Sequence, residues 1–211
     1  MQVILMILPW IVMMVFAFLL GSLPFSIWLG RLALKGKDVR KYGDGNPGAT
    51  TALRAGGWKL GLAVLMLDIT KGALPVGLAY QVFGFTGWQM WCIALAPTLG
   101  HVFSPFLGGR GGKGLAVTLG VWIGLSLAKV ALPILIILTF WYLILSVDGW
   151  AVMFTIASLF VFLYLVMPGS LYLAVLGGQT ILLAWTHRDD LRKKPGFHRR
   201  VRHLFHKAES K

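Results

Sequence analysis

Long apolar segments follow one another along most of the chain, and they restrict its fold more than any other feature. They cover roughly residues 3–29, 60–82, 88–107, 114–128, 130–147, 150–167 and 170–186. A helix needs about 20 apolar residues to cross the hydrocarbon core of a bilayer, and only helices and closed barrels satisfy their backbone hydrogen bonds there. With 57% hydrophobic and 13% charged residues, the sequence predicts an all-α integral membrane protein with about seven transmembrane helices.

Neither an internal repeat nor a separate soluble segment interrupts this pattern. We therefore expect residues 1–192 to form a single polytopic membrane domain, followed by a basic tail at 193–211. The start of the chain has no basic n-region and no small-residue cleavage site, so the first apolar segment is expected to be an anchor and not a removable signal. Segment 114–128 is short for a full crossing, and we expect it to be tilted, half-inserted or buried among the others.

The distribution of charge predicts the orientation of the chain. Segment 31–59 has seven Lys and Arg against two Asp, and the end of the chain, 187–211, has nine against three acidic residues. The connections near 83–88 and 167–170 have no charge. By the positive-inside rule, the basic segments and the loop at 108–113 face the cytoplasm, with the N-terminus outside and the C-terminus inside. Topology thus accounts for the net charge of +13, and we do not expect nucleic-acid binding.

The basic tail has a helical pattern of its own. Its apolar residues Phe197, Val201, Leu204 and Phe205 are spaced i, i+4, i+7 and i+8. This spacing favours an amphipathic helix that lies on a leaflet with anionic headgroups, with a solvated basic tail as the alternative. The histidines of the tail are spaced irregularly and the single cysteine, Cys92, lies in an apolar segment. No metal site is therefore predicted.

A glycine-rich polar loop, Gly108–Gly114 (GGRGGKG), interrupts the apolar pattern. Successive glycine amides can turn toward one point and hold an anion, and Arg110 and Lys113 add positive charge. The pattern differs from a nucleotide-binding P-loop, because Leu107 stands at its first glycine and Gly114 at its Ser/Thr. A phosphate group that does not belong to a nucleotide is the predicted ligand. A tight cytoplasmic turn with topological cations is the alternative.

Two further polar groups lie at the ends of apolar segments. Asp68 and Lys71 are spaced i, i+3 within a predicted membrane helix, which indicates either a functional site or an internal ion pair between helices. His101 and Ser104 precede the glycine-rich loop. We expect Pro105 to end their helix and Ser104 to have a capping or packing role, since nothing makes it a nucleophile.

Four motifs occur in an order that resembles one known family. They are GSLPF at 21–25, KYGDGNPGATT at 41–51 followed by Arg54, LDITKG at 67–72, and GHVFSPFLGGRGGKG at 100–114. The chain resembles the acyl-phosphate-dependent glycerol-3-phosphate acyltransferases of bacterial phospholipid synthesis. The similarity continues to His187–Leu191 (HRDDL), which resembles the family's His-Arg-x-Asn-Ile near the end of its last helix.

The resemblance implies a seven-helix, multi-pass enzyme of the bacterial inner membrane with its active site facing the cytoplasm. It would transfer a fatty acyl group from acyl phosphate to the 1-hydroxyl of glycerol 3-phosphate, giving lysophosphatidic acid and phosphate, without a cofactor. Acyl phosphate is a mixed anhydride from which phosphate leaves easily, so no covalent acyl-enzyme is required. The protein must supply orientation, charge neutralisation and a route for one proton.

Site residues are carried over by position. The resemblance implies Lys113, His187 and Arg54 as catalytic residues, and Asp44, Asn46, His101, Gly111, Gly112, Gly114 and Asp190 as substrate-binding residues. The backbone amides of the glycines would hold the donor phosphate, and the cations would line the acceptor site together with Asn46. His187 is the candidate base, and a phosphate oxygen of the substrate is the alternative proton acceptor.

Three acidic residues depart from the family's pattern. Asp44 stands where the family usually has Ser, and Asp190 where it usually has Asn. Asp148 falls in a loop, Val147–Ala151 (VDGWA), that usually reads VSLAS. A carboxylate about 4 Å from a phosphate costs about 4 kcal/mol at an effective dielectric constant of 20, so such residues require compensation.

Three arrangements would provide this compensation. Asp44 pairs with a Lys or Arg, a divalent cation lies between carboxylate and phosphate, or the acceptor is a different one, such as a cationic or neutral polyol. A transporter of phosphate compounds or a non-catalytic lipid-binding relative is the alternative from another class. Transporters often show inverted repeats and interrupted helices at mid-membrane. Here the glycines gather near one face of the predicted membrane domain, which favours an enzyme.

Overall fold

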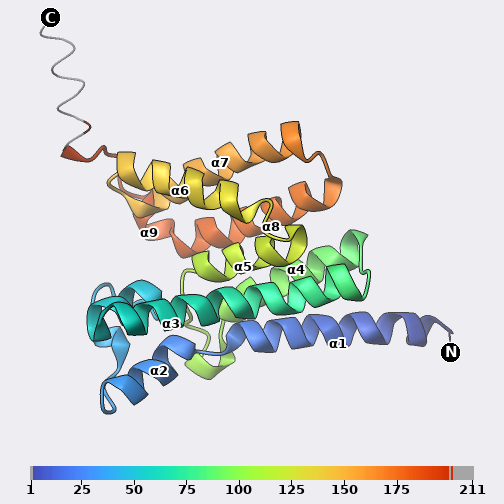
Figure 1. Ribbon diagram of the computed structural model, residues 1–211, viewed down its shortest axis with the longest axis horizontal. Coiled ribbons are helices and arrows are strands. Elements are labelled where there is room, and N and C mark those ends of the chain that lie inside the picture. The colour runs from blue at the N-terminus through green and yellow to red at the C-terminus, as the bar shows by residue number, and fades with distance from the viewer. Residues whose placement is uncertain (1, 200, 202–211) are drawn as a thin grey trace, which may run out of the picture. The chain divides into compact units, whose positions relative to one another are not determined.

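The computed structural model describes residues 2–199 and 201, with side chains from Ile7 onward, and every regular element among them is a helix. The larger helices are α1 (Gln2–Ser22), α2 (Phe25–Ala33), α3 (Ala49–Gly77), α4 (Gly87–Val102), α5 (Leu115–Ser126), α6 (Ala131–Ile144), α7 (Asp148–Val166) and α8 (Ser170–Thr186) (Figure 1). The short elements are η1 (Val39–Lys41), η2 (Leu78–Val82), η3 (Pro105–Leu107) and α9 (Arg188–Leu191). The chain forms two compact units, of which the first ends at Ala131 and the second begins at Leu132.

The helices coincide with the apolar segments of the sequence, which confirms the all-α class. Four stretches of the described residues are long and apolar enough to cross a membrane: Ile7–Ala33, Ala49–Val82, Gly87–Leu107 and Asp148–Val166. Helices α5, α6 and α8 are apolar but shorter. The number of seven crossings, the orientation of the chain and its organisation as one membrane domain stay predictions.

The first apolar segment is not one continuous helix. Helix α1 ends at Ser22 and α2 begins at Phe25, after Leu23 and Pro24. Proline has no amide hydrogen to donate and disfavours the helical conformation in the residue before it, so the pair Leu23–Pro24 separates the two helices. Helix α3 is interrupted at Gly57, whose backbone is not helical (φ 79°, ψ −178°), so a short helical segment from Ala49 precedes the part that contains the apolar segment starting near residue 60.

Within the first unit, α3 and α5 pack with their backbones in close contact. A Cβ atom on Gly72 of α3 would overlap the carbonyl oxygen of Val117, and one on Gly120 of α5 would overlap that of Ile69. Gly124, one turn after Gly120, lies against α3 in the same way. Small residues at this spacing let membrane helices approach closely, where van der Waals contact replaces the hydrophobic effect as the source of attraction.

Helices α1 and α4 form the second close pair of this unit. A Cβ atom on Gly21 of α1 would overlap the carbonyl oxygen of Pro97, and one on Gly100 of α4 would overlap that of Phe18. Helix α4 ends at Val102, and Pro105 begins the short helix η3. The predicted helix end at Pro105 is therefore confirmed, and the glycine-rich loop follows directly.

In the second unit, the chain after α9 returns to the connection between α6 and α7. The amide of Ser146 donates to the carbonyl of Gly196 at 2.8 Å, and that of His198 donates to Ile144 at 3.0 Å. The indole of Trp150 donates to the carbonyl of Lys193 at 2.8 Å. Most of the predicted amphipathic tail helix lies outside the described residues, and it stays a prediction.

The close packing of α3 and α5 generates a stability prediction. We expect Gly120→Ala to destabilise the protein by roughly 1–3 kcal/mol, because its methyl group would overlap the carbonyl oxygen of Ile69 and force the helices apart. Thermal unfolding in lipid nanodiscs measures the effect. Gly177→Ala in α8 is the matched control, since nothing lies within 4 Å of a Cβ at that exposed helical glycine. Equal melting temperatures for the two variants would contradict the proposed contact.

Candidate active site

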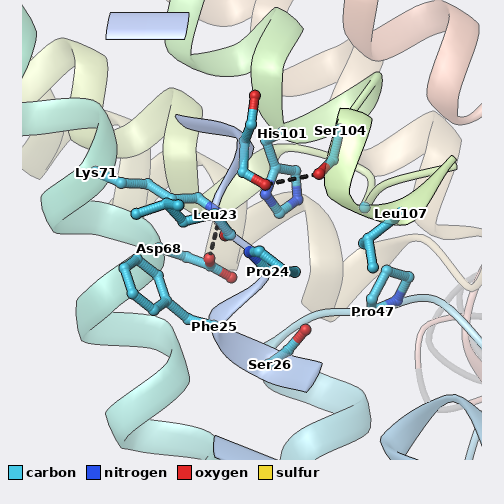
Figure 2. Close-up of a pocket in the computed structure, with 12 residues that line it drawn as sticks. Leu23, Pro24, Phe25, Ser26, Pro47, Asp68, Lys71, His101, Ser104 and Leu107 are labelled. Atoms are coloured by element: carbon cyan, nitrogen blue, oxygen red, sulfur yellow. Dashed lines mark hydrogen bonds and ion pairs between the residues drawn. The ribbon is translucent and has the colours of Figure 1, made fainter. Parts of the chain in front are cut away.

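A small polar pocket lies in the first unit, where the α1–α2 break, α3 and the end of α4 meet (Figure 2). Its lining also includes one residue of the glycine-rich loop and one of the turn before α3. The lining residues are Ser22, Leu23, Pro24, Phe25, Ser26, Pro47, Asp68, Lys71, His101, Ser104, Leu107 and Gly112. All four motifs of the sequence contribute residues to this lining.

An ion pair between Lys71 and Asp68 is buried beside this pocket. The Lys71 Nζ lies 2.7 Å from the Asp68 Oδ1, and the two side chains are 2% and 4% exposed. The Lys71 Nζ also donates a hydrogen bond of 2.9 Å to the carbonyl of Leu23. The pair therefore joins α3 to the break between α1 and α2, which supports the interpretation as an internal ion pair.

Ser104 has the packing role that the sequence predicts. Its hydroxyl is buried and donates a hydrogen bond of 2.6 Å to the carbonyl of Ser22, the last residue of α1 (Figure 2). This contact joins the end of α4 to the end of α1. The hydroxyl proton is thus committed to a backbone acceptor.

The glycine-rich loop folds back onto the end of α4. The amide of Gly111 donates to the carbonyl of Val102 at 2.9 Å, and that of Gly112 donates to His101 at 3.2 Å. Carbonyls in the last turn of a helix have no partner within the helix, and the loop amides satisfy two of them. The amides of Gly111 and Gly112, which we expected to bind a phosphate, therefore donate to the protein's own backbone in this structure. Their role in substrate binding stays a prediction.

His101 packs directly against this loop. A Cβ atom on Gly112 would overlap the Nε2 of His101 and would lie 2.9 Å from the carbonyl oxygen of Pro47. Only glycine therefore fits between the imidazole and the turn before α3. His101 is 9% exposed, so it contributes to the wall beneath the loop.

Lys113 reaches the turn that precedes α3, where Asp44 lies between Gly43 and Gly45, both with positive φ. The Lys113 Nζ is 3.5 Å from the Asp44 Oδ2. The other carboxylate oxygen, Oδ1, accepts from the amide of Asn46 at 3.2 Å and from the Thr51 hydroxyl at 3.4 Å. Of the three compensating arrangements, this is the pairing of Asp44 with a cation.

Arg54 lies along the same turn. A Cβ atom on Gly43 would lie 2.9 Å from a terminal nitrogen of the Arg54 guanidinium. The first unit thus brings together the predicted site residues Asp44, Asn46 and Arg54, which are close in the sequence, and Lys113, which is far from them. Within the described residues, no group of three or more His, Cys, Asp or Glu side chains is arranged to hold a metal ion.

The second unit contains His187, which is buried at the end of α8. Its Nδ1 lies 2.9 Å from the carbonyl oxygen of Leu183. A carbonyl can only accept, so we assign the ring proton to Nδ1, which leaves Nε2 as the nitrogen that can accept a proton. This tautomer is suitable for the predicted role as a base.

Asp190 lies near His187 and has its own cation. Its carboxylate is 2.8 Å from the Lys193 Nζ, and this contact raises the pKa of Lys193. A Cβ atom on Gly149 would lie 2.8 Å from that of Asp190 and 3.3 Å from that of His187. The start of α7, which Asp148 begins, is therefore packed against α9. Asp190 and Lys193 are spaced i, i+3, a sequence signal from which their pairing could have been predicted.

The buried ion pair makes a testable prediction. We expect Lys71→Met to destabilise the protein by about 3–5 kcal/mol, because it leaves the Asp68 carboxylate buried without its cation. The double variant Lys71→Met/Asp68→Leu should recover part of that loss in a thermal unfolding experiment. Arg192→Met is the control, since Arg192 and Asp189 form a pair with the same spacing but are 78% and 74% exposed, and should cost less than about 1 kcal/mol. A Lys71→Met protein as stable as the control would contradict the prediction.

Comparison with known proteins identifies relatives over most of the chain. The family model for glycerol-3-phosphate acyltransferase matches residues 11–194. The glycerol-3-phosphate acyltransferase of Maridesulfovibrio salexigens is 37% identical over 187 residues, which cover 87% of this chain and 92% of the relative. That of Thermus thermophilus is 37% identical over 192 residues, which cover 88% of this chain and 92% of the relative.

A solved structure has the same architecture. The crystal structure of PlsY, an integral membrane glycerol 3-phosphate acyltransferase in its glycerol 3-phosphate form, matches 93% of this chain and 99% of its own, with a TM-score of 0.79 and 32% sequence identity. The match to the family model, the near full-length relatives and this shared architecture lead to one conclusion. The chain belongs to the glycerol-3-phosphate acyltransferase family of integral membrane proteins.

Proposed function

We propose that this protein transfers a fatty acyl group from an acyl phosphate to the 1-hydroxyl of glycerol 3-phosphate, releasing lysophosphatidic acid and inorganic phosphate. Family membership over residues 11–194 supports the reaction and its acceptor. The observation that carries the proposal is that Lys113 and Arg54 both lie at one glycine turn. Such a pair of cations offers both positive charge and hydrogen-bond donors to a phosphate.

For the phosphate we propose a position at the start of α5. Gly114, with a φ of 88°, precedes this helix and directly follows Lys113. The first amides of a helix have no partner within the helix, and the helix dipole places partial positive charge there, so anions are favoured. Because the amides of Gly111 and Gly112 bind the end of α4, the predicted phosphate contacts shift to Gly114, the first turn of α5 and Lys113.

The chemistry requires no covalent intermediate with the enzyme. The hydroxyl oxygen of glycerol 3-phosphate attacks the acyl carbonyl carbon, the bond from that carbon to the phosphate oxygen breaks, and the hydroxyl proton is released. Lys113 and Arg54 stabilise the negative charge that develops on the departing phosphate. For His187 we propose the role of proton acceptor, which its assigned tautomer supports.

We propose that the protein is a multi-pass protein of the bacterial inner membrane and that its active site faces the cytoplasm. The excess of Lys and Arg in segment 31–59 and in the tail supports this orientation. Anionic headgroups of the same leaflet are the proposed surface partner of the tail.

Two of the three acidic departures no longer favour a different acceptor. Asp44 has Lys113 as a partner and Asp190 has Lys193. Each of these carboxylates is therefore close to a cation within its own unit, which lowers its repulsion of a phosphate. Glycerol 3-phosphate remains the proposed acceptor.

The role of Lys113 is tested by Lys113→Ala. We expect its rate to fall about 10²–10³-fold, because one charged group that stabilises the departing phosphate is lost. The assay supplies palmitoyl phosphate and glycerol 3-phosphate to the protein in lipid nanodiscs, and measures phosphate and lysophosphatidic acid together. Arg110→Ala removes the same charge from an exposed position of the same loop and should retain most of the activity. A fully active Lys113→Ala protein would refute the assignment.

The role of His187 is tested by His187→Gln. We expect kcat to fall at least about 10²-fold, since the glutamine amide can donate a hydrogen bond but cannot accept and hold a proton. Activity across pH should also lose the dependence that a titrating base gives the native protein. If a phosphate oxygen of the substrate accepts the proton instead, the variant keeps its rate within about tenfold and its pH dependence unchanged.

A further inference from the structure

Asp44 introduces a fixed negative charge beside the cation to which we assign the substrate phosphate. Its Oδ2 lies 3.5 Å from the Lys113 Nζ. Its Oδ1 accepts hydrogen bonds from the Asn46 amide and the Thr51 hydroxyl, neither of which involves the lysine. The carboxylate is therefore held by its own turn and by the first turn of α3, independently of Lys113.

The contact between the two side chains is accessible to solutes. The side chain of Lys113 is 30% exposed and that of Asp44 is 55% exposed. Ion pairs with this exposure are weak, so an anion from solution can exchange with the carboxylate. The Asp44 carboxylate and a phosphate are both anionic acceptors for the Lys113 ammonium group. A phosphate bound to Lys113 would lie close to the carboxylate, so the two negative charges would repel each other.

We propose that Asp44 lowers the phosphate affinity of the site: its carboxylate is an internal anion that competes with phosphate groups for Lys113 and weakens their binding. This inference rests on the proposed function of Lys113 as the phosphate-binding cation. A chain with a neutral side chain at this position would bind the same phosphate more tightly. Because inorganic phosphate is a product of the proposed reaction, Asp44 also limits product inhibition.

The discriminating experiment measures binding of inorganic phosphate to the full-length protein in lipid nanodiscs, by calorimetric titration in the presence of EDTA. Asp44→Asn is the main variant, since it removes the charge and keeps an oxygen that can accept from Asn46 and Thr51. Asp44→Ser provides a second test, and size-exclusion chromatography verifies that both variants are folded. Asp38→Asn is the matched control, because Asp38 belongs to the same basic segment but pairs with Arg40 at 2.7 Å.

We expect Asp44→Asn to bind phosphate roughly fivefold to fiftyfold more tightly, as the removal of one nearby charge predicts. Asp38→Asn should bind it like the native protein. In a Lys113→Met background, Asp44→Asn should change the phosphate affinity little further, because the cation for which the carboxylate and the phosphate compete is absent. Unchanged or weaker binding by Asp44→Asn would overturn the proposal, as would an equal gain with and without Lys113.

A divalent cation between carboxylate and phosphate predicts the opposite result. In that case, Mg²⁺ would strengthen phosphate binding to the native protein, and Asp44→Asn would abolish this gain. Such an outcome would also overturn the proposal.

Steady-state kinetics separates this inference from the proposed function. With acyl phosphate and glycerol 3-phosphate as substrates, Asp44→Asn should lower both the KM of a phosphate-bearing substrate and the inhibition constant of inorganic phosphate. Phosphate binding with the expected pattern but without acyl transfer in any variant would refute the proposed reaction and leave the role of Asp44 intact. Acyl transfer with the same KM and the same inhibition constant of phosphate in Asp44→Asn as in the native protein would refute the role of Asp44 alone.

Discussion

The geometry of the first unit depends on a charge that would be costly to bury alone. Lys71 lies within an apolar helix, where an unpaired ammonium group is strongly disfavoured. Asp68 and the carbonyl of Leu23 satisfy it together, and the second of these is available because Pro24 separates α1 from α2. The helix break and the ion pair together offset the cost of burying Lys71, and they also hold α3 against the break between α1 and α2.

Glycines transmit this geometry to the site. Gly72 and Gly120 bring the backbones of α3 and α5 together, so the start of α5 is fixed relative to the turn before α3. The loop between α4 and α5 then satisfies the end of α4 with the amides of Gly111 and Gly112. This loop conformation places the Lys113 side chain beside Asp44. The pairing of these two charges therefore depends on the backbone arrangement.

Features that depend on neighbouring residues in the sequence were predicted correctly, whereas contacts between residues far apart in the sequence could not be predicted. The spacing of Asp68 and Lys71 predicted their interaction, and Pro105 predicted the end of α4. The partner of Asp44 was only one of three alternatives, since nothing local relates it to Lys113. The amides of Gly111, Gly112 and Gly114 were expected to bind a phosphate, but a sequence does not reveal which amides an adjacent helix end will use.

The sequence by itself determined the class of the protein, because apolar segments of this length must be helical in lipid and because its motifs occur in the order of one family. It also determined which residue types are available for phosphate chemistry. Only the tertiary structure decided which of these groups meet. Hydrogen-bond partners and ion pairs depend on distances between segments, and those distances are set by helix packing through Gly72, Gly120 and the buried Lys71, which no local pattern encodes.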